Sequence, residues 1–193
     1  MYSTMEKVHS KYVFNRRTNV LAAHFLEMLP QQGTVLDVGC GDGLIDHLIN
    51  KQRPMLKIEG IDVLLRKQTH ISVTKFDGNK IPFEDNSFDV VMFVDVLHHT
   101  NDPKALLKEA KRVARQYVVI KDHTMDGLFA ETTLRFMDWV GNAPHGVVLP
   151  YNYWTKQQWY DAFKELDLTV ENWKGALNLY PLPANWLFDF IVK

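Results

Sequence analysis

The 193-residue sequence contains only one cysteine, Cys40. A single thiol excludes a disulfide within the chain and any metal site built from several cysteines. The chain also lacks an excess of basic charge, because 22 lysine and arginine residues nearly balance 23 aspartate and glutamate residues to give a net charge of −1. Proteins that bind a nucleic-acid backbone normally carry a basic excess or a basic patch. We therefore expect no nucleic-acid partner.

Long hydrophobic runs are missing too. No segment approaches the ~18 consecutive apolar residues of a transmembrane helix, so we expect no transmembrane segment. The first residues lack the apolar core and small-residue cleavage site of a signal peptide, which favours a cytoplasmic protein. A hydrophobic content of 46% in a chain of this length suits one domain, which we expect over residues 1–193.

Short apolar runs bounded by turn residues alternate with segments of helical spacing. Strands are predicted over 34–38, 57–62, 70–76, 88–94, 117–121, 168–173 and 186–192, and helices over 5–29, 44–53, 103–114 and 156–166. This alternation predicts a doubly wound α/β fold whose parallel sheet is covered by helices on both faces. Right-handed crossovers place the carboxyl ends of the parallel strands at one edge of the sheet, where ligands bind.

The junction between the first strand and the second helix carries the strongest functional signal, Asp37-Val38-Gly39-Cys40-Gly41-Asp42-Gly43. Gly39 and Gly41 would let the backbone turn tightly and approach a ligand closely. The dinucleotide fingerprint G-x-G-x-x-G seats a pyrophosphate, but the spacing here is G-x-G-x-G. A carboxylate at Asp37 would repel phosphate and would suit the ammonium and sulfonium groups of S-adenosylmethionine.

Two more acidic residues follow the next two strands. Asp62 ends the second strand, where its side chain could bind both ribose hydroxyls, and Asp77 in Phe76-Asp77-Gly78 could receive an adenine amino group. A lone acidic residue at a strand end is usually a turn former. Acidic residues at three successive strand ends favour a nucleoside site instead.

A longer segment resembles the class I S-adenosylmethionine-dependent methyltransferases, in particular the methyltransferase type 11 or quinone-biosynthesis branch. The shared residues are Asp77, the run Ile81-Pro82-Phe83-Glu84-Asp85-Asn86-Ser87-Phe88-Asp89-Val90-Val91, and then Leu97-His98-His99, Asp102-Pro103 and Arg112-Val113. The resemblance covers residues 33–122. It implies a Rossmann-like, three-layer α/β/α fold with a seven-stranded, mostly parallel sheet whose last strand is antiparallel.

The resemblance also implies a cofactor, S-adenosylmethionine, with S-adenosylhomocysteine as the product. The residues expected to contact it are Asp37, Gly39, Cys40, Gly41, Asp62, Val63, Asp77, Gly78, Val94, Asp95 and His98. Cys40 is expected only to fill space, because the neighbouring Asp37 and Asp42 would raise the pKa of its thiol.

Two departures from the family pattern leave the substrate open. Residues 63–69, between the second and third strands, are too few for the usual crossover helix, so one flank of the adenine pocket would be open. The Pro-Gly-Gly that commonly precedes the fifth strand is replaced by Ala114-Arg115-Gln116.

Histidines after the fourth and fifth strands are candidates for general base catalysis, since imidazole titrates near neutral pH. His123 is preferred, because the end of the fifth strand usually faces the substrate, and His99 is the second candidate. A metal site from His98, His99, Asp122 and His123 is conceivable, but no ligand spacing specific to a metal is present, so we predict none.

Residues 124–155 form a long aromatic insertion, the expected substrate lid, and residues 1–30 an N-terminal helical cap. Long insertions in compact domains are often binding loops. Candidate substrate contacts are Tyr12, Trp139, Tyr151 and Tyr153, although these rings could equally pack on the edge of the sheet.

The sequence thus predicts methyl transfer from S-adenosylmethionine to a small-molecule or lipid-like acceptor by in-line displacement. Two alternatives stay open: a non-catalytic module that binds S-adenosylmethionine, and a nicotinamide-dependent oxidoreductase, which the glycine spacing disfavours. The oligomeric state is not predicted.

Overall fold

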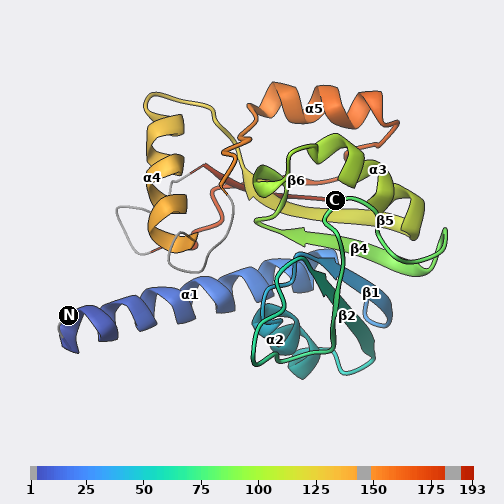
Figure 1. The fold of residues 1–193 in the computed structure, drawn as a ribbon, viewed down its shortest axis with the longest axis horizontal. Coiled ribbons are helices and arrows are strands. Elements are labelled where there is room, and N and C mark those ends of the chain that lie inside the picture. Colours follow the sequence, from blue (N-terminus) through green and yellow to red (C-terminus); the bar gives the residue numbers. More distant parts are fainter. Residues whose placement is uncertain (1–3, 143–148, 181–187) are drawn as a thin grey trace.

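A computed structural model describes residues 4–142, 149–180 and 188–193 of the chain (Figure 1). The elements, in chain order, are α1 (Thr4–Met28), β1 (Gly33–Val38), α2 (Leu44–Gln52), β2 (Leu56–Asp62), β3 (Val73–Lys75), β4 (Phe88–Val94), the 3₁₀ helix η1 (Leu97–His99), α3 (Pro103–Val113), β5 (Ala114–His123), α4 (Ala130–Asn142), α5 (Lys156–Glu165), β6 (Trp173–Gly175) and β7 (Asp189–Val192). None of the helices in these ranges is long and apolar enough to cross a membrane.

The seven strands form one sheet in the order β3-β2-β1-β4-β5-β7-β6. Strands β1 to β5 pair in parallel, whereas β7 runs antiparallel to both β5 and β6. The strand order reverses between β1 and β4, because the chain winds outward to β3 and then returns to the other side of β1. Ligands bind at such a switch point, beyond the carboxyl ends of the strands. The predicted Rossmann-like α/β fold is confirmed.

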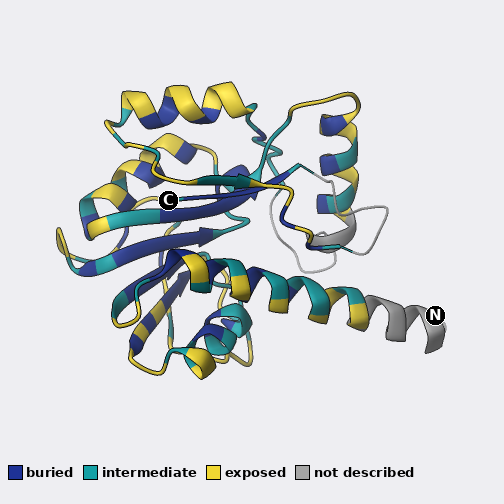
Figure 2. Ribbon diagram, turned by 180° about the vertical axis from the view of Figure 1, so that it is seen from behind, coloured by how far each residue is buried: buried dark blue, intermediate teal, exposed yellow. Residues whose placement is uncertain are grey.

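Both faces of the sheet are buried, as β4 illustrates. Val91 and Phe93 lie in the core beneath α3 and α5, while Val90 and Met92 lie in the core beneath α1 and α2. Successive side chains of a strand point to opposite faces, so a strand between two helical layers must be apolar throughout. Figure 2 shows this arrangement, with buried strands between helices whose outer faces are exposed.

Capping residues begin two of the helices, as the sequence predicts. The Asp102 side chain accepts a hydrogen bond from the Ala105 N–H at 3.0 Å, with Pro103 in the first helical position. Thr155 and Gln158 form a capping box at the start of α5. These contacts satisfy N–H groups that have no partner within the helix.

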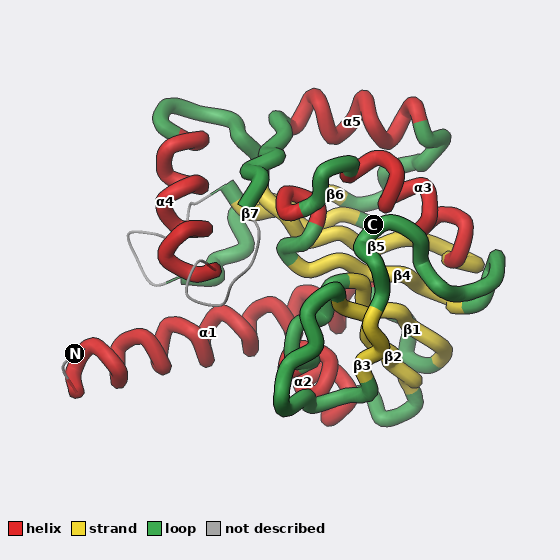
Figure 3. The backbone as a smooth tube through the Cα atoms, in the orientation of Figure 1, coloured by secondary structure: helices red, strands yellow, loops and turns green. Residues whose placement is uncertain are grey.

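Four predicted segments differ in the structure. The third strand is shorter than predicted, and the strand predicted over 168–173 is replaced by β6, since Leu168 and Val170 pack on the core from a loop. The last strand begins at Asp189, and residues 186–187 of its predicted range lie outside the described residues. Residues 124–155, predicted as a long insertion with no helix assigned, contain α4. Between β2 and β3, Figure 3 shows only a loop, as the short spacing predicts.

Candidate functional site

The glycine loop after β1 leaves open space beside its backbone. Gly39 has φ +80°, and a Cβ added there would lie 2.6 Å from the Val96 Cγ2 atom, so only glycine fits. Gly41 has φ +62°, but an added Cβ would meet no atom within 4 Å. The backbone at Gly41 can therefore be approached closely by a ligand, because no side chain stands between them.

Asp62 holds this loop against the end of β2. Its Oδ2 accepts a hydrogen bond from the Gly41 N–H at 2.8 Å, and its Oδ1 accepts one from the Leu64 N–H at 2.7 Å. The carboxyl group therefore lies beside the open face of the glycine loop in a fixed orientation. The structure brings Asp62 and Gly41 together as the sequence predicts.

The next acidic residue, Asp77, is exposed at the end of the segment that follows β3. Its Oδ1 accepts hydrogen bonds from the N–H groups of Asn79 (2.8 Å) and Lys80 (2.9 Å), which lower the pKa of the carboxyl group. Asp77 thus shapes a turn that includes Gly78. A Cβ on Gly78 would lie 3.1 Å from Val63, so the ends of β2 and β3 are in close contact.

The loop after β2 presents apolar side chains to solvent. Val63 is 52% exposed, Leu64 40% and Leu65 49%. No crossover helix covers this loop (Figure 3). Exposed aliphatic side chains beside a carboxyl group suit a nucleoside, whose base is planar and apolar on its faces.

Two buried carboxyl groups, those of Asp37 and Asp46, lie beneath the glycine loop. The sequence analysis named Asp37 but not Asp46. Burial, followed by the proximity of Asp46, raises the pKa of Asp37 well above its usual value. Burial likewise raises the pKa of Asp46, on α2, to about 7. Asp37 is buried and its raised pKa disfavours the charged form, and its contact with the cofactor stays a prediction. Asp62 is the acidic group beside the open face of the loop.

Cys40 fills space under the same loop. A Cβ added to Gly60 would lie 2.4 Å from the Cys40 Sγ, so the sulfur occupies the room that a side chain would need. Burial, with the nearby Asp37, raises the pKa of the thiol. The raised pKa disfavours the reactive thiolate form of Cys40, and Asp46 and Asp62 also contribute to this shift.

Beyond β4 and β5 an ionic cluster surrounds a fully buried lysine. Lys121 Nζ lies 2.5 Å from Asp95 Oδ1 and 2.6 Å from Asp189 Oδ1. Arg17 of α1 forms an ion pair with the other oxygen of Asp95. Burial alone would raise the pKa of Asp95, but Lys121 and Arg17 hold it well below its usual value. The cluster fastens α1 and β7 to the end of β4.

His123 lies against this cluster. Its Nε2 is 3.3 Å from Asp95 Oδ1 and its Nδ1 is 3.1 Å from Asp189 Oδ1. Both ring nitrogens of the preferred base candidate thus face carboxylates rather than an open site.

His98 is buried at the start of the histidine pair in η1. Its Nδ1 lies 2.5 Å from Asp122 Oδ1, and Asp122 Oδ2 accepts a hydrogen bond from the Leu97 N–H at 3.1 Å. Burial alone would lower the pKa of His98, but Asp122 and Asp138 raise it to about 10. The same carboxylate therefore orients both the imidazole and the backbone of η1.

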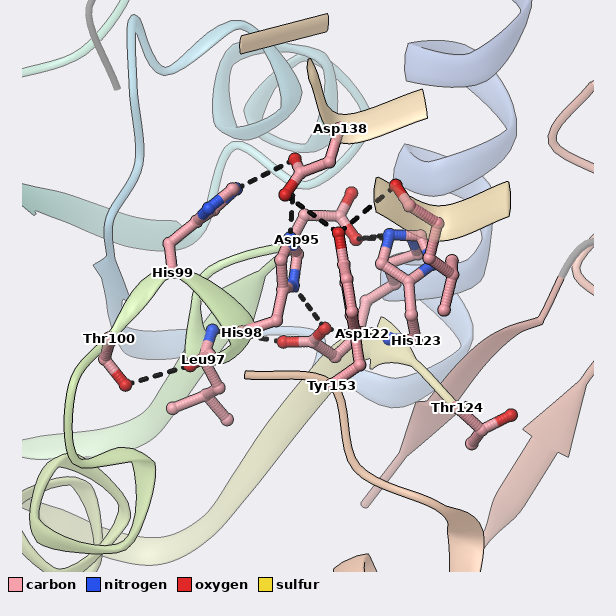
Figure 4. Close-up of polar contacts among 12 residues, drawn as sticks. Asp95, Leu97, His98, His99, Thr100, Asp122, His123, Thr124, Asp138 and Tyr153 are labelled. Atoms are coloured by element: carbon pink, nitrogen blue, oxygen red, sulfur yellow. Dashed lines mark hydrogen bonds and ion pairs between the residues drawn. The ribbon is translucent and has the colours of Figure 1, made fainter. Parts of the chain in front are cut away.

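His99 has the opposite character. Burial and the neighbouring His98, whose ring centroid is 4.0 Å away, lower the pKa of His99 to about 4. The imidazole is consequently neutral at pH 7. Its Nε2 lies 3.4 Å from Asp138 Oδ1, as Figure 4 shows.

Asp138 and Tyr153 connect residues 124–155 to these histidines (Figure 4). The Tyr153 hydroxyl donates a hydrogen bond to Asp138 Oδ2 at 2.8 Å, and its ring stacks on His98 with centroids 5.2 Å apart. Asp138 lies on α4 and is buried. The sequence analysis missed it because α4 was not predicted. Asp138 follows the buried Leu134 by four residues, and this helical spacing in the sequence could have indicated that both side chains lie on one face of a helix.

The other candidate substrate contacts lie further out. Tyr12 on α1 is 61% exposed and Trp139 on α4 is 57% exposed. Tyr151 has φ +57°, and the Arg135 guanidinium lies 5.0 Å above its ring. Of the four aromatic candidates, only Tyr153 contacts the histidines in the structure.

Comparison with known proteins places the chain in a family. A family profile for the methyltransferase domain matches residues 11–172, so the chain belongs to this family. A 2-methyl-6-phytyl-1,4-hydroquinone methyltransferase of Synechocystis sp. is 28% identical over 181 residues, which is 83% of this chain and 52% of that protein. Ribosomal RNA-processing protein 8 of Caenorhabditis briggsae is 32% identical over 113 residues, 58% of this chain and 30% of that protein. The chain thus spans about half or less of the length of these relatives.

Solved methyltransferase structures share the fold of this chain. A methyltransferase solved in complex with the Haloferax volcanii Trm112 methyltransferase activator superimposes with a TM-score of 0.69 at 17% identity, covering 95% of this chain and 92% of that chain. The chain is thus a methyltransferase domain with the class I fold, and S-adenosylmethionine is the cofactor that this family implies. The open backbone at Gly41, the adjoining Asp62 carboxyl group and the exposed Val63 are compatible with that cofactor.

Proposed function

We propose that the enzyme transfers the methyl group of S-adenosylmethionine to an apolar aromatic acceptor, a small molecule or a lipid-like one. The observation that carries this proposal is a concentration of exposed apolar side chains on α1 and on residues 124–155. They are Tyr12, Phe14, Leu128, Phe129, Phe136 and Trp139. Exposed apolar side chains gathered on few elements favour a binding surface, since isolated ones are scattered over any protein.

The cofactor residues are proposed from the geometry of the strand ends. Gly39, Cys40 and Gly41 would face the methionine portion, Asp62 the ribose hydroxyls, and Val63 with Asp77 and Gly78 the adenine. The backbone of Val94 and Asp95 and the ring of His98 would line the side toward the acceptor, and Asp37 would support the loop from below. When bound, the sulfonium supplies an electrophilic methyl group.

The side chains beyond β4 and β5 then face the acceptor. In-line displacement requires the acceptor atom to be aligned with the methyl group, which positioned side chains provide. Tyr153 is held by Asp138 and stacked on His98, so its ring offers a fixed wall. The role of proton acceptor, where the acceptor atom carries a proton, stays a prediction for His123 and His99.

An aromatic acceptor is supported by the relative named for a phytyl hydroquinone, whose alignment covers most of this chain. RNA is the competing acceptor, because another relative is named for ribosomal RNA processing. The net charge of −1 argues against RNA, since phosphate contacts need lysine and arginine in excess.

Two measurements test the proposal. Calorimetric titration of the full chain should show binding of S-adenosylmethionine and S-adenosylhomocysteine and no binding of NAD. Methyl transfer from labelled S-adenosylmethionine should then label short-chain alkyl hydroquinones and leave RNA unlabelled. Labelled RNA with unlabelled hydroquinones would overturn the choice of acceptor.

A matched pair of variants locates the acceptor surface. Trp139→Ala should raise the KM for the hydroquinone several-fold without changing the affinity for S-adenosylmethionine, because it removes an exposed ring from α4. Tyr160→Ala is the control, since it removes an exposed ring from α5, outside the proposed surface. Equal KM values for the two variants would contradict this placement.

A further inference from the structure

Three side-chain atoms from η1 and α4 converge beside the proposed acceptor surface. His98 Nε2 lies 3.8 Å from Asp138 Oδ1, and His99 Nε2 lies 3.4 Å from the same oxygen. One ligand atom from each of the three residues lies within 4.8 Å of the other two. Figure 4 shows both imidazoles pointing toward the Asp138 carboxylate.

These separations suit a shared metal ion better than direct hydrogen bonds. An N–H···O hydrogen bond spans about 2.7–3.2 Å, which is shorter than either distance. Nitrogen and oxygen ligands of a tetrahedral Zn²⁺ lie about 2.0–2.1 Å from the ion, so they are roughly 3.3 Å from each other. The observed spacing therefore leaves room for one ion between the three atoms.

The surrounding contacts orient two of the three side chains for this purpose. His98 Nδ1 faces Asp122 Oδ1 at 2.5 Å, which directs Nε2 toward Asp138 and His99. A carboxylate behind a ligating imidazole is the usual arrangement in metalloproteins. Tyr153 donates to Asp138 Oδ2, so that Oδ1 is the oxygen turned toward the imidazoles.

In a second cluster of possible metal ligands in the same region, a lysine ammonium group occupies the position of the cation. Asp95, His123 and Asp189 also bring one ligand atom each within 4.8 Å of the others. There, Lys121 Nζ contacts both carboxylates at 2.5 and 2.6 Å. The ammonium group takes the place of a metal ion in that cluster and would repel one.

We propose that His98, His99 and Asp138 bind one divalent transition-metal ion of the Zn²⁺ class. Two neutral imidazoles and one carboxylate suit Zn²⁺ and its neighbours in the first transition series, so binding of the ion displaces the proton of His98 Nε2 to solvent. The His99 side chain is 15% exposed, against 3% and 6% for the other two, so an open coordination position lies on its side. The ion joins η1 to α4 and so couples residues 124–155 to the end of β4. This proposal stands on side-chain geometry and does not depend on the acceptor.

The test is metal binding by the full chain without an affinity tag, after treatment with a chelator. Titration with Co²⁺ should give the visible absorption of a four-coordinate site at one ion per chain, and Zn²⁺ should abolish it by displacement. Asp138→Asn and His99→Gln should each weaken Zn²⁺ binding by at least about 100-fold, because each removes a ligand. Asp122→Asn keeps all three ligands and should weaken it by about 10- to 100-fold.

His70→Gln is the control, since it removes an exposed histidine elsewhere and should leave Zn²⁺ binding unchanged. A wild-type chain that gives no cobalt absorption, or His99→Gln and Asp138→Asn variants that bind Zn²⁺ as tightly as wild type, would overturn the proposal. Titration with S-adenosylmethionine keeps the two proposals separate. A chain that binds the cofactor but no metal refutes the ion alone, and one that binds metal but no cofactor refutes the cofactor site alone.

Discussion

The Asp62 carboxylate accepts a hydrogen bond from the Gly41 N–H at 2.8 Å, across the carboxyl ends of β1 and β2. This contact places the acidic side chain at the open side of the glycine loop. Asp62→Ala should therefore weaken S-adenosylmethionine binding by at least about 100-fold, through loss of the proposed ribose contacts and of the loop support. Calorimetric titration measures the affinity. Glu59→Ala, an exposed change on the same strand, should leave it unchanged. Equal affinity in Asp62→Ala and wild type would remove the ribose assignment.

Alanine at the two loop glycines should separate folding from cofactor binding. Gly41→Ala adds a methyl group to open space, so it should cost only the ~1–2 kcal/mol of a left-handed backbone, yet it should reduce cofactor affinity strongly. Gly39→Ala adds the same backbone strain and a 2.6 Å contact with Val96, so it should destabilise the ligand-free protein more. Denaturant unfolding and titration of both variants check this order. A Gly41→Ala protein with unchanged affinity would show that the cofactor does not approach that backbone.

Replacing the buried lysine should be costly. Lys121→Met would leave the carboxylates of Asp95 and Asp189 buried without their shared cation, and we expect a loss of about 3–5 kcal/mol in the free energy of unfolding. The exposed pair of Lys104 and Glu165 supplies the comparison, since Lys104→Met should cost less than about 1 kcal/mol. Urea unfolding measures both. Similar losses in the two variants would mean that the buried cluster contributes no more than a surface ion pair.

The buried carboxyl pair predicts a pH dependence of stability. Burial raises the pKa of Asp46 to about 7, above the ~3.9 of an unfolded aspartate. Between these values the folded state keeps a proton that the unfolded state releases, so this group lowers the free energy of unfolding as the pH rises. Asp46→Asn lacks this effect. Its stability relative to wild type should increase by up to about 1.4 kcal/mol per pH unit from about pH 4.5 to 6.5. Unfolding at several pH values measures the difference, and a flat difference would show that Asp46 titrates normally.

Much of the proposed cofactor site could be predicted from the sequence, because the glycine loop and the strand before it are marked by residues close together in the chain. The apolar run before Gly39 predicts a buried strand, and glycines at Gly39 and Gly41 predict a tight turn. Asp62 could be placed because parallel strands end at the same edge of a sheet. The raised pKa of Asp37 could not be predicted. It depends first on burial and then on Asp46, which the helical turn of α2 brings beneath the loop.

The histidine region shows where prediction from sequence stops. The sequence places His98, His99 and His123 near one edge of the sheet, and the structure confirms that neighbourhood. Their different characters come from partners far along the chain. Asp122 and Asp138 surround His98, whereas Asp95 and Asp189 surround His123. The proposed metal site depends on α4, which brings Asp138 to the histidines.

The sequence by itself determined the order of the strands and of the helices other than α4, the glycine turn after the first strand and the acidic residues at the ends of the next two. These features follow from periodicity and from backbone conformations that few residues can adopt. Only the tertiary structure decided in which direction burial and neighbouring charges shift the pKa values of the carboxyl and imidazole groups, and which acidic side chain reaches the histidine pair. Those properties depend on burial and on distances of a few ångströms between residues far apart in the chain, because electrostatic energies fall off with separation and rise steeply where water is excluded.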